Sequence, residues 1–213
     1  MNFGDITTEV GILIADSSSK VVSRIPGAIN EAVLFAAEKV DIPSLKSLIN
    51  VSTVVDQAWA SLPSSSAGKI THVSSSSSNG DKIQILPNLE DLLEHSPSLD
   101  FIGSVDMVAQ EGMTLYYQSI PTTVQRLLVV HYAFPDVLRE EGDIPIDFPS
   151  SLHRGLFVHG ALSNLYEIIE DGLEEEEKTN TLWHKNLRDE AINGLFAWRA
   201  KNRRGRTRHP YNV

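Results

Sequence analysis

Apolar residues recur every three or four positions near both ends of the chain, and every second position through its middle. The apolar stripe over residues 25–40 predicts a helix that begins at Pro26 and ends before Pro43, because proline is tolerated in a first helical turn and cannot continue a helix. A shorter stripe over residues 5–15 predicts a preceding helix with Asp5 as its N-cap. Each stripe indicates a helix that buries one face.

The most apolar segment is Pro149–Asp171, in which apolar side chains cover about half of the helical circumference. Ser150 and Ser151 can cap its start, and Gly172 can end it. A helix of this kind must be covered by several neighbours, so we expect it at the centre of a helical core. The last amphipathic helix, Thr181–Asn202, follows an acidic turn and should form a helix hairpin with it.

The middle of the chain alternates between apolar and polar positions and is rich in β-branched residues, as half-buried strands are. Asn79-Gly80 and Glu111-Gly112 each separate two alternating runs, so they predict antiparallel hairpins. Short helical pieces are predicted over residues 88–94 and 135–139. The alternating runs are residues 49–54, 69–74, 82–86, 103–109, 113–119 and 122–134.

The order of helices, strands and helices predicts an α+β fold, in which a helical bundle carries an inserted antiparallel β-rich module. We expect residues 1–48 to form the N-terminal helical part of the body and residues 49–140 to form the inserted module. Residues 141–202 should complete the body as a C-terminal helix hairpin, and residues 203–213 should form a basic flexible tail.

The composition narrows the class of protein. The chain has no cysteine, which excludes disulfides, thiolate metal sites and a cysteine nucleophile. No run of apolar residues approaches the ~20 that span a bilayer, and the first residues lack the basic and apolar regions of a signal peptide. We therefore expect a soluble protein that stays in the cell that makes it, with no membrane partner.

The net charge of −10 hides a strong asymmetry. Residues 1–190 carry 12 basic and 28 acidic side chains, a net charge of −16, whereas the residues after Glu190 carry six basic and no acidic side chains. A body this acidic repels nucleic acid over most of its surface. The basic end can contact phosphate or an acidic groove of a protein, and its charge does not choose between them.

No arrangement of residues carries catalytic chemistry. His153 and His159 lie six positions apart on one predicted helix and therefore point about 120° away from each other, and no metal-binding spacing is present. The acids Asp56, Asp106 and Glu111 are scattered through the strands, where exposed carboxylates are expected. Nucleotide-binding glycine loops and nucleophile motifs are missing. We expect a protein that is not an enzyme and that needs no metal and no cofactor.

Two segments can carry a function. The serine tract Ser74, Ser75, Ser76, Ser77 and Ser78, followed by Asn79 and Gly80, is either a mobile hairpin tip or a loop that becomes ordered against another subunit or lines a lumen. The C-terminal segment is either a merely solubilising end or a disordered tail that folds on docking into a groove of a partner. Its candidate contacts are Arg199, Lys201, Arg203, Arg204, Arg206, Arg208 and Tyr211.

Several short phrases carry a family resemblance, together with the last amphipathic helix and its basic end. They are Arg24–Val33 (RIPGAINEAV), Leu62-Pro63, Tyr116-Tyr117 with Pro121, Tyr132 with Pro135, and Ile146–His153 (IDFPSSLH). In these phrases and in its layout over residues 5–202, the chain resembles the head-to-tail adaptor proteins of tailed double-stranded DNA bacteriophages, also called head completion or connector proteins.

The resemblance implies a structural virion protein at the junction of capsid and tail, made in the host cytoplasm. Such adaptors form a ring, usually a dodecamer, beneath the portal protein, and tail or nozzle proteins attach below. DNA passes through the lumen without sequence-specific binding, and an acidic wall would let it slide. The resemblance also implies that the C-terminal segment, here Arg199–Val213, reaches into the portal ring. The long serine-rich tract has no assigned place in such a ring.

Two other interpretations remain open. A tail terminator or a tail-tube component would form a sixfold ring lower in the tail. A nucleic-acid-binding regulator would use the arginine-rich segment, and its affinity for DNA would fall steeply with salt. The acidic body and the missing recognition-helix motif count against this second class.

Overall fold

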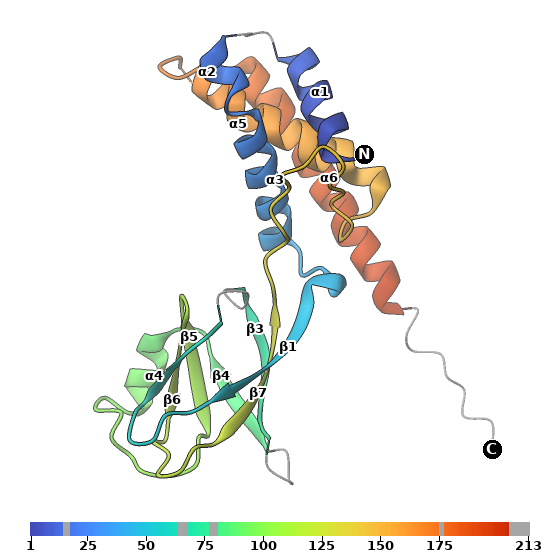
Figure 1. Ribbon diagram of the computed structural model, residues 1–213. Coiled ribbons are helices and arrows are strands. Elements are labelled where there is room, and N and C mark those ends of the chain that lie inside the picture. The colour runs from blue at the N-terminus through green and yellow to red at the C-terminus, as the bar shows by residue number, and fades with distance from the viewer. Residues whose placement is uncertain (15–17, 64–67, 77–80, 175–176, 205–213) are drawn as a thin grey trace, which may run out of the picture. The chain divides into compact units, whose positions relative to one another are not determined.

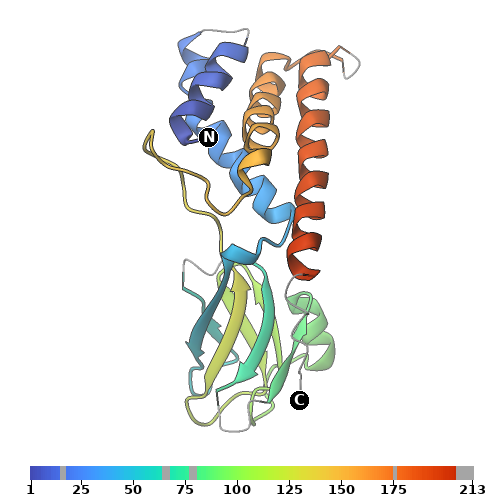
Figure 2. The same cartoon turned by 90° about the vertical axis from the view of Figure 1, so that its right-hand side faces the viewer.

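A computed structural model describes residues 1–14, 18–63, 68–76, 81–174 and 177–204 (Figure 1). The chain divides into two compact units. The helical unit comprises Met1–Pro43 and Pro135–Val213, and the sheet unit comprises Ser44–Phe134. Figure 2 shows the elements of each unit from a second direction.

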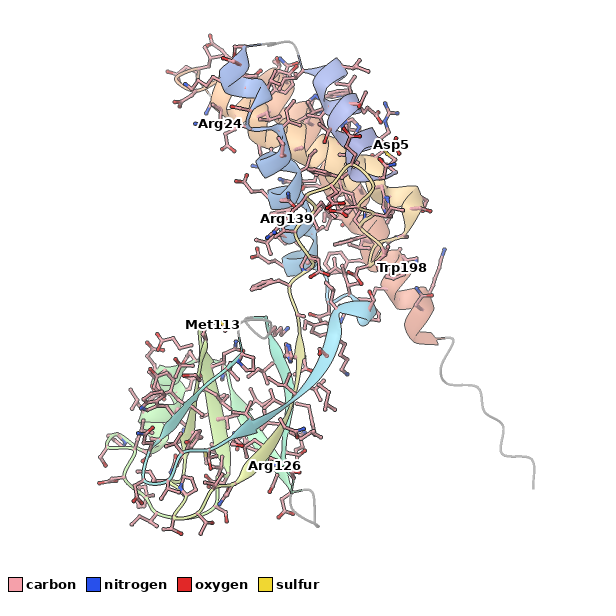
Figure 3. The ribbon with its side chains drawn as sticks, viewed as in Figure 1. Asp5, Arg24, Met113, Arg126, Arg139 and Trp198 are labelled. Atoms are coloured by element: carbon pink, nitrogen blue, oxygen red, sulfur yellow. The ribbon has the colours of Figure 1, made fainter. Side chains whose placement is uncertain are left out.

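Three helices of the helical unit, over residues 3–13, 25–39 and 179–204, begin and end within about two residues of the predicted positions, whereas a short helix at Ser19–Val22 was not predicted. Asn2 rather than Asp5 is the N-cap of the first helix, and the side chain of Asp5 in turn accepts a bond from the Asn2 backbone, which completes a capping box (Asp5 is labelled in Figure 3). The elements are α1 (Phe3–Leu13), α2 (Ser19–Val22), α3 (Ile25–Lys39), α5 (His159–Ile169) and α6 (Thr179–Arg204).

The segment predicted as one central helix is less regular. It begins with a 3₁₀ turn at Ser150–Leu152, continues as a π-helical turn at Arg154–Val158, and becomes α-helical only at His159. Glycines allow close packing on both sides of this segment. A Cβ atom added to Gly155 would lie 2.5 Å from the Ala191 Cβ atom of α6. The segment and α5 pack against α1, α3 and α6 and form the core of the helical unit, as their apolar pattern predicted.

The predicted helical piece over residues 135–139 is wrong, because these residues are not helical. Side-chain oxygens instead accept hydrogen bonds from the backbone N–H groups of residues 138–140. The Leu138 N–H donates to Asn30 Oδ1, and the N–H groups of Arg139 and Glu140 donate to Asp143 Oδ2.

The sheet unit holds a curled, mixed sheet of seven strands in the order β1-β7-β3-β4-β5-β6-β2 (Figure 1). Six strands overlap the alternating runs of the sequence, although β5 begins at Met107 rather than at residue 103, and the short strand β2 was not predicted. Helix α4 buries Leu92 against Leu86 and Ala109 of the sheet. The elements are β1 (Lys46–Ser52), β2 (Trp59–Ser61), β3 (Ile70–Ser75), β4 (Lys82–Leu86), α4 (Leu89–His95), β5 (Met107–Glu111), β6 (Thr114–Gln118) and β7 (Arg126–Tyr132).

The predicted fold class, a helical bundle with an inserted antiparallel β-rich module, is wrong. The two predicted hairpins exist, since β3 pairs with β4 and β5 with β6 in antiparallel register. However, β4 and β5 are parallel, with Ile85 opposite Val108, so that the hairpins join into one mixed sheet. Alternation shows which face of a strand is buried but not which strand is its neighbour. The fold is therefore α+β with a seven-stranded curled mixed sheet.

Candidate functional site

The basic end of the chain continues α6 beyond its packed part. Leu195 is the last fully buried residue of this helix, and Trp198 and Arg199 are half-buried (Trp198 is labelled in Figure 3). Lys201 is exposed, and the helix ends at Arg204. Arg206, Arg208 and Tyr211 lie outside the described residues.

Arg199 binds to its own subunit. Its guanidinium donates to Asp41 Oδ2 at 2.5 Å, and only 16% of its side chain is exposed. Asp41 follows Val40, the C-cap of α3, so the ion pair connects α6 to the segment that leaves α3. Arg199 thus holds α6 in place, and Lys201, two residues later, is exposed to solvent.

The serine tract begins inside the sheet. Ser74 and Ser75 belong to β3, and Ser74 is buried opposite Leu128 of β7. Ser76 is exposed, and its backbone N–H donates to the Arg126 carbonyl at 2.8 Å. Ser77, Ser78, Asn79 and Gly80 lie outside the described residues. Ser74 and Ser75 are therefore part of the sheet and not of the loop predicted from this tract.

A cluster of aromatic and histidine rings connects α5 to α6. The Nδ1 atoms of His159 and His184 are 3.0 Å apart, which is the distance of a hydrogen bond. His184 also stacks on the ring of Tyr166, with centroids 5.4 Å apart and planes 11° apart. The indole of Trp183 packs edge-on against both imidazoles, and 57% of this residue is exposed.

Burial favours the neutral form of both imidazoles. Burial and, after it, the nearby His159 lower the pKa of His184 to about 4, although Glu170 opposes the shift. Burial, followed by the charge of Arg154, also lowers the pKa of His159. At neutral pH one ring therefore donates an N–H to the other. Sequence spacing did not predict this pair, because the two residues lie on different helices whose relative register no local pattern reveals.

A buried carboxylate holds the beginning of α6. Glu170 Oε2 accepts bonds from the Thr181 N–H at 3.1 Å and the Thr181 hydroxyl at 2.7 Å, and Oε1 accepts two bonds from Asn180. Burial alone would raise the pKa of Glu170, but these hydrogen bonds outweigh it and lower the pKa. Glu170, the residue that directly follows α5, thus also caps the next helix.

The other candidate residues are divided between the two units: His153 belongs to the helical unit, and Asp106 and Glu111 belong to the sheet unit. His153 is buried and its Nε2 lies 3.1 Å from the Phe148 carbonyl, away from the pair formed by His159. Asp106 and Glu111 lie at opposite ends of β5. Within the described ranges, no three histidine, aspartate or glutamate side chains are placed to hold a metal ion. None of the helices that the structure describes is long and apolar enough to cross a membrane.

Comparison with known protein families finds none that matches the chain, and comparison with curated proteins finds no similar sequence. The features that remain are surfaces: a basic helix end, an exposed tryptophan and several exposed apolar side chains.

Proposed function

We propose that the protein is a structural virion protein, a head-to-tail adaptor of a tailed double-stranded DNA phage. In this proposal it forms a ring beneath the portal, joins the capsid to the tail and lets DNA pass. The short phrases around Arg24–Val33 and Ile146–His153 support the proposal at the level of sequence. One structural observation carries it: α6 continues past its last fully buried residue, Leu195, and ends in cations on an otherwise acidic chain.

The end of α6 and the residues after it are the proposed portal contacts. Arg199 supports this contact indirectly, since its bond to Asp41 fixes the helix that leads to the other cations in the sequence. Arginine is suited to the task because its planar guanidinium binds carboxylates through two parallel bonds. The direct contacts in this proposal are Lys201, Arg203, Arg204, Arg206, Arg208 and Tyr211.

The acidic character of residues 1–190 suits the passage of DNA. A lumen lined by carboxylates does not bind phosphates, so DNA slides past it, whereas a lumen lined by arginine would hold it. In the ring, we propose that the cations are used in protein contacts and are kept out of the lumen. Tail or nozzle proteins would attach to the opposite side of the ring.

The test is portal binding by the purified full-length protein and by a variant that lacks residues 203–213. We expect the full-length protein to form twelvefold rings on the portal, and the truncated protein to remain folded by circular dichroism and to lose portal binding. A matched control, Lys20→Gln with Arg24→Gln, removes two exposed cations elsewhere in the helical unit and should bind the portal normally. Undiminished binding by the truncated protein would contradict the proposed role of the C-terminal segment.

The same preparations separate the two alternatives. A sixfold ring that binds tail-tube protein and no portal would identify a tail terminator or tail-tube component. A steep fall in DNA affinity with salt that depends on residues 203–213 would instead support a nucleic-acid-binding protein.

A further inference from the structure

The segment between β7 and the 3₁₀ turn at Ser150 presents apolar side chains to solvent. Ile146 is 82% exposed, Val137 60% and Ile144 53%. They surround a pocket of about 240 Å³, which Val33 of α3 and Phe148 also line. We call this pocket, with the lining residues 135–138 and 143–148, the loop pocket. A cavity of about 150 Å³ holds a benzene ring, so the loop pocket has room for one aromatic side chain.

The loop pocket is held in place by hydrogen bonds. Leu138 exchanges two bonds with the Asn30 side chain, of 2.8 and 3.0 Å. The carboxylate of Asp143 accepts the N–H groups of Arg139 and Glu140, and the Asp143 carbonyl accepts the Phe3 N–H at 2.7 Å. Because the backbone is fixed before any partner arrives, a partner binds without the entropic cost of ordering this loop.

The rim of the loop pocket is acidic. Residues 136–147 contain five carboxylates and one cation, Arg139, which is labelled in Figure 3. Asp136, Asp143 and Asp147 line the pocket itself. Hydrogen bonds from the backbone of Arg139 and Glu140 lower the pKa of Asp143, so its carboxylate is charged at neutral pH. The ligand that fits this surface is a cationic peptide with an aromatic or branched apolar anchor.

The chain itself contains a segment of this chemistry. Residues 205–213 (GRTRHPYNV) carry Arg206, Arg208 and Tyr211 and no acid. They continue from α6, and Figure 2 shows α6 and the loop 135–148 on opposite sides of the helical unit. This arrangement favours a neighbouring subunit over the same subunit as the source of the segment.

We propose that residues 205–213 of a second copy of the chain bind in the loop pocket, with Tyr211 inserted and the arginines against the acidic rim. A contact between two different surfaces on opposite sides of a subunit is heterologous, and it generates a ring when the rotation closes. The contact is small, so the self-association of the free protein is weak. One segment cannot occupy this pocket and the portal at once, so portal binding would replace the contact.

The first part of the test is sedimentation of the purified full-length protein at low and at high salt. We expect association that weakens with salt, and an association constant lowered about tenfold or more in two variants. One variant lacks residues 205–213, and the other is Asp136→Asn with Ile146→Ser. The matched control is Asp106→Asn with Ile102→Ser, which makes the same chemical changes at exposed positions of the sheet unit and should associate normally.

The second part mixes the truncated protein, which keeps the pocket, with the loop variant, which keeps the segment. We expect one-to-one complexes that neither protein forms alone, and no larger species. The proposal would be overturned if the mixture stays monomeric while the full-length protein associates. It would also be overturned if residues 205–213 bind within their own subunit. The loop variant should still bind the portal, so loss of this contact and loss of the proposed portal role are separate results.

Discussion

His159 of α5 and His184 of α6 face each other through their Nδ1 atoms at 3.0 Å, and Tyr166 stacks on the far side of His184. Only 4% of His184 is exposed, so this hydrogen bond lies inside the contact between the two helices. The bond requires at least one neutral ring, and a neutral pair is the form that burial favours.

The pair makes the stability of the helical unit depend on pH. The pKa of His184 is about 4 in the folded protein, below its unfolded value of 6.5. A folded pKa below the unfolded value means that the stabilisation is complete above pH 6.5 and is lost as the pH falls towards 4. The loss should reach up to about 3 kcal/mol, measured as the free energy of urea unfolding between pH 7.5 and pH 4.

The control for this prediction is His184→Phe, which keeps a ring against Tyr166 and cannot be protonated. Its unfolding free energy should fall less between these two pH values than that of the unchanged protein. An identical decline in both proteins would assign the acid sensitivity to other groups, among which Glu9, Arg154 and Glu170 lie close enough to affect the two histidines.

Replacing Glu170 by glutamine should destabilise the beginning of α6. The carboxylate accepts bonds from Asn180 and Thr181, and an amide cannot accept all of them, so we expect a loss of about 1–3 kcal/mol in unfolding free energy. The exposed Glu167, which lies one turn earlier on α5, is the matched control, and Glu167→Gln should change little. Equal losses for the two variants would show that only the charge of this helix end matters.

Gly160→Ala should destabilise the helical unit through the contact between α5 and α3. The new Cβ atom would lie 2.7 Å from the Ala32 Cβ atom, which is closer than packed carbon atoms approach. Shifting the helices to accommodate it should cost about 1–3 kcal/mol by chemical denaturation. In contrast, a Cβ atom at Gly27 of α3 meets nothing within 4 Å, so Gly27→Ala should be neutral or stabilising by up to about 1 kcal/mol.

The ion pair between Arg199 and Asp41 should contribute modestly to stability. Both side chains are partly buried, and a double-mutant cycle with Arg199→Gln and Asp41→Asn should give a coupling of about 0.5–1 kcal/mol. Lys201 is exposed, lies two residues further along α6 and is not part of this ion pair, so Lys201→Gln in place of Arg199→Gln should show no coupling to Asp41→Asn. A coupling near zero would remove Arg199 as the residue that fixes the end of α6.

Local patterns of the sequence predicted most of the elements, but not how the strands pair. The apolar stripe of α3 and the alternation of β4 are set by neighbours in the sequence, so the bounds of both elements are close to those predicted. The pairing of β1 with β7, in which Ile49 lies opposite Val129, joins segments about 80 residues apart. The parallel pairing of β4 with β5 depends on the crossover through α4.

Of the candidate site at the basic end of the chain, the sequence predicted the charge but not the contacts. The acidic chain and its basic end follow from counting residues, whereas the bond of Arg199 to Asp41 depends on how α6 lies beside α3. The loop pocket could not be predicted from the sequence either, because the local pattern of residues 135–139 predicted a helical piece there. The bonds from Asn30 and Asp143 that shape this segment come from residues outside it.

The most direct test of the proposed function is electron microscopy of phage particles purified from cells that make this protein, with the protein located by a specific antibody fragment. We predict labelling at the junction of capsid and tail, on a ring of twelve subunits directly beneath the portal. Labelling of a sixfold ring lower in the tail, or particles in which the protein is missing, would contradict the proposal that it is the head-to-tail adaptor.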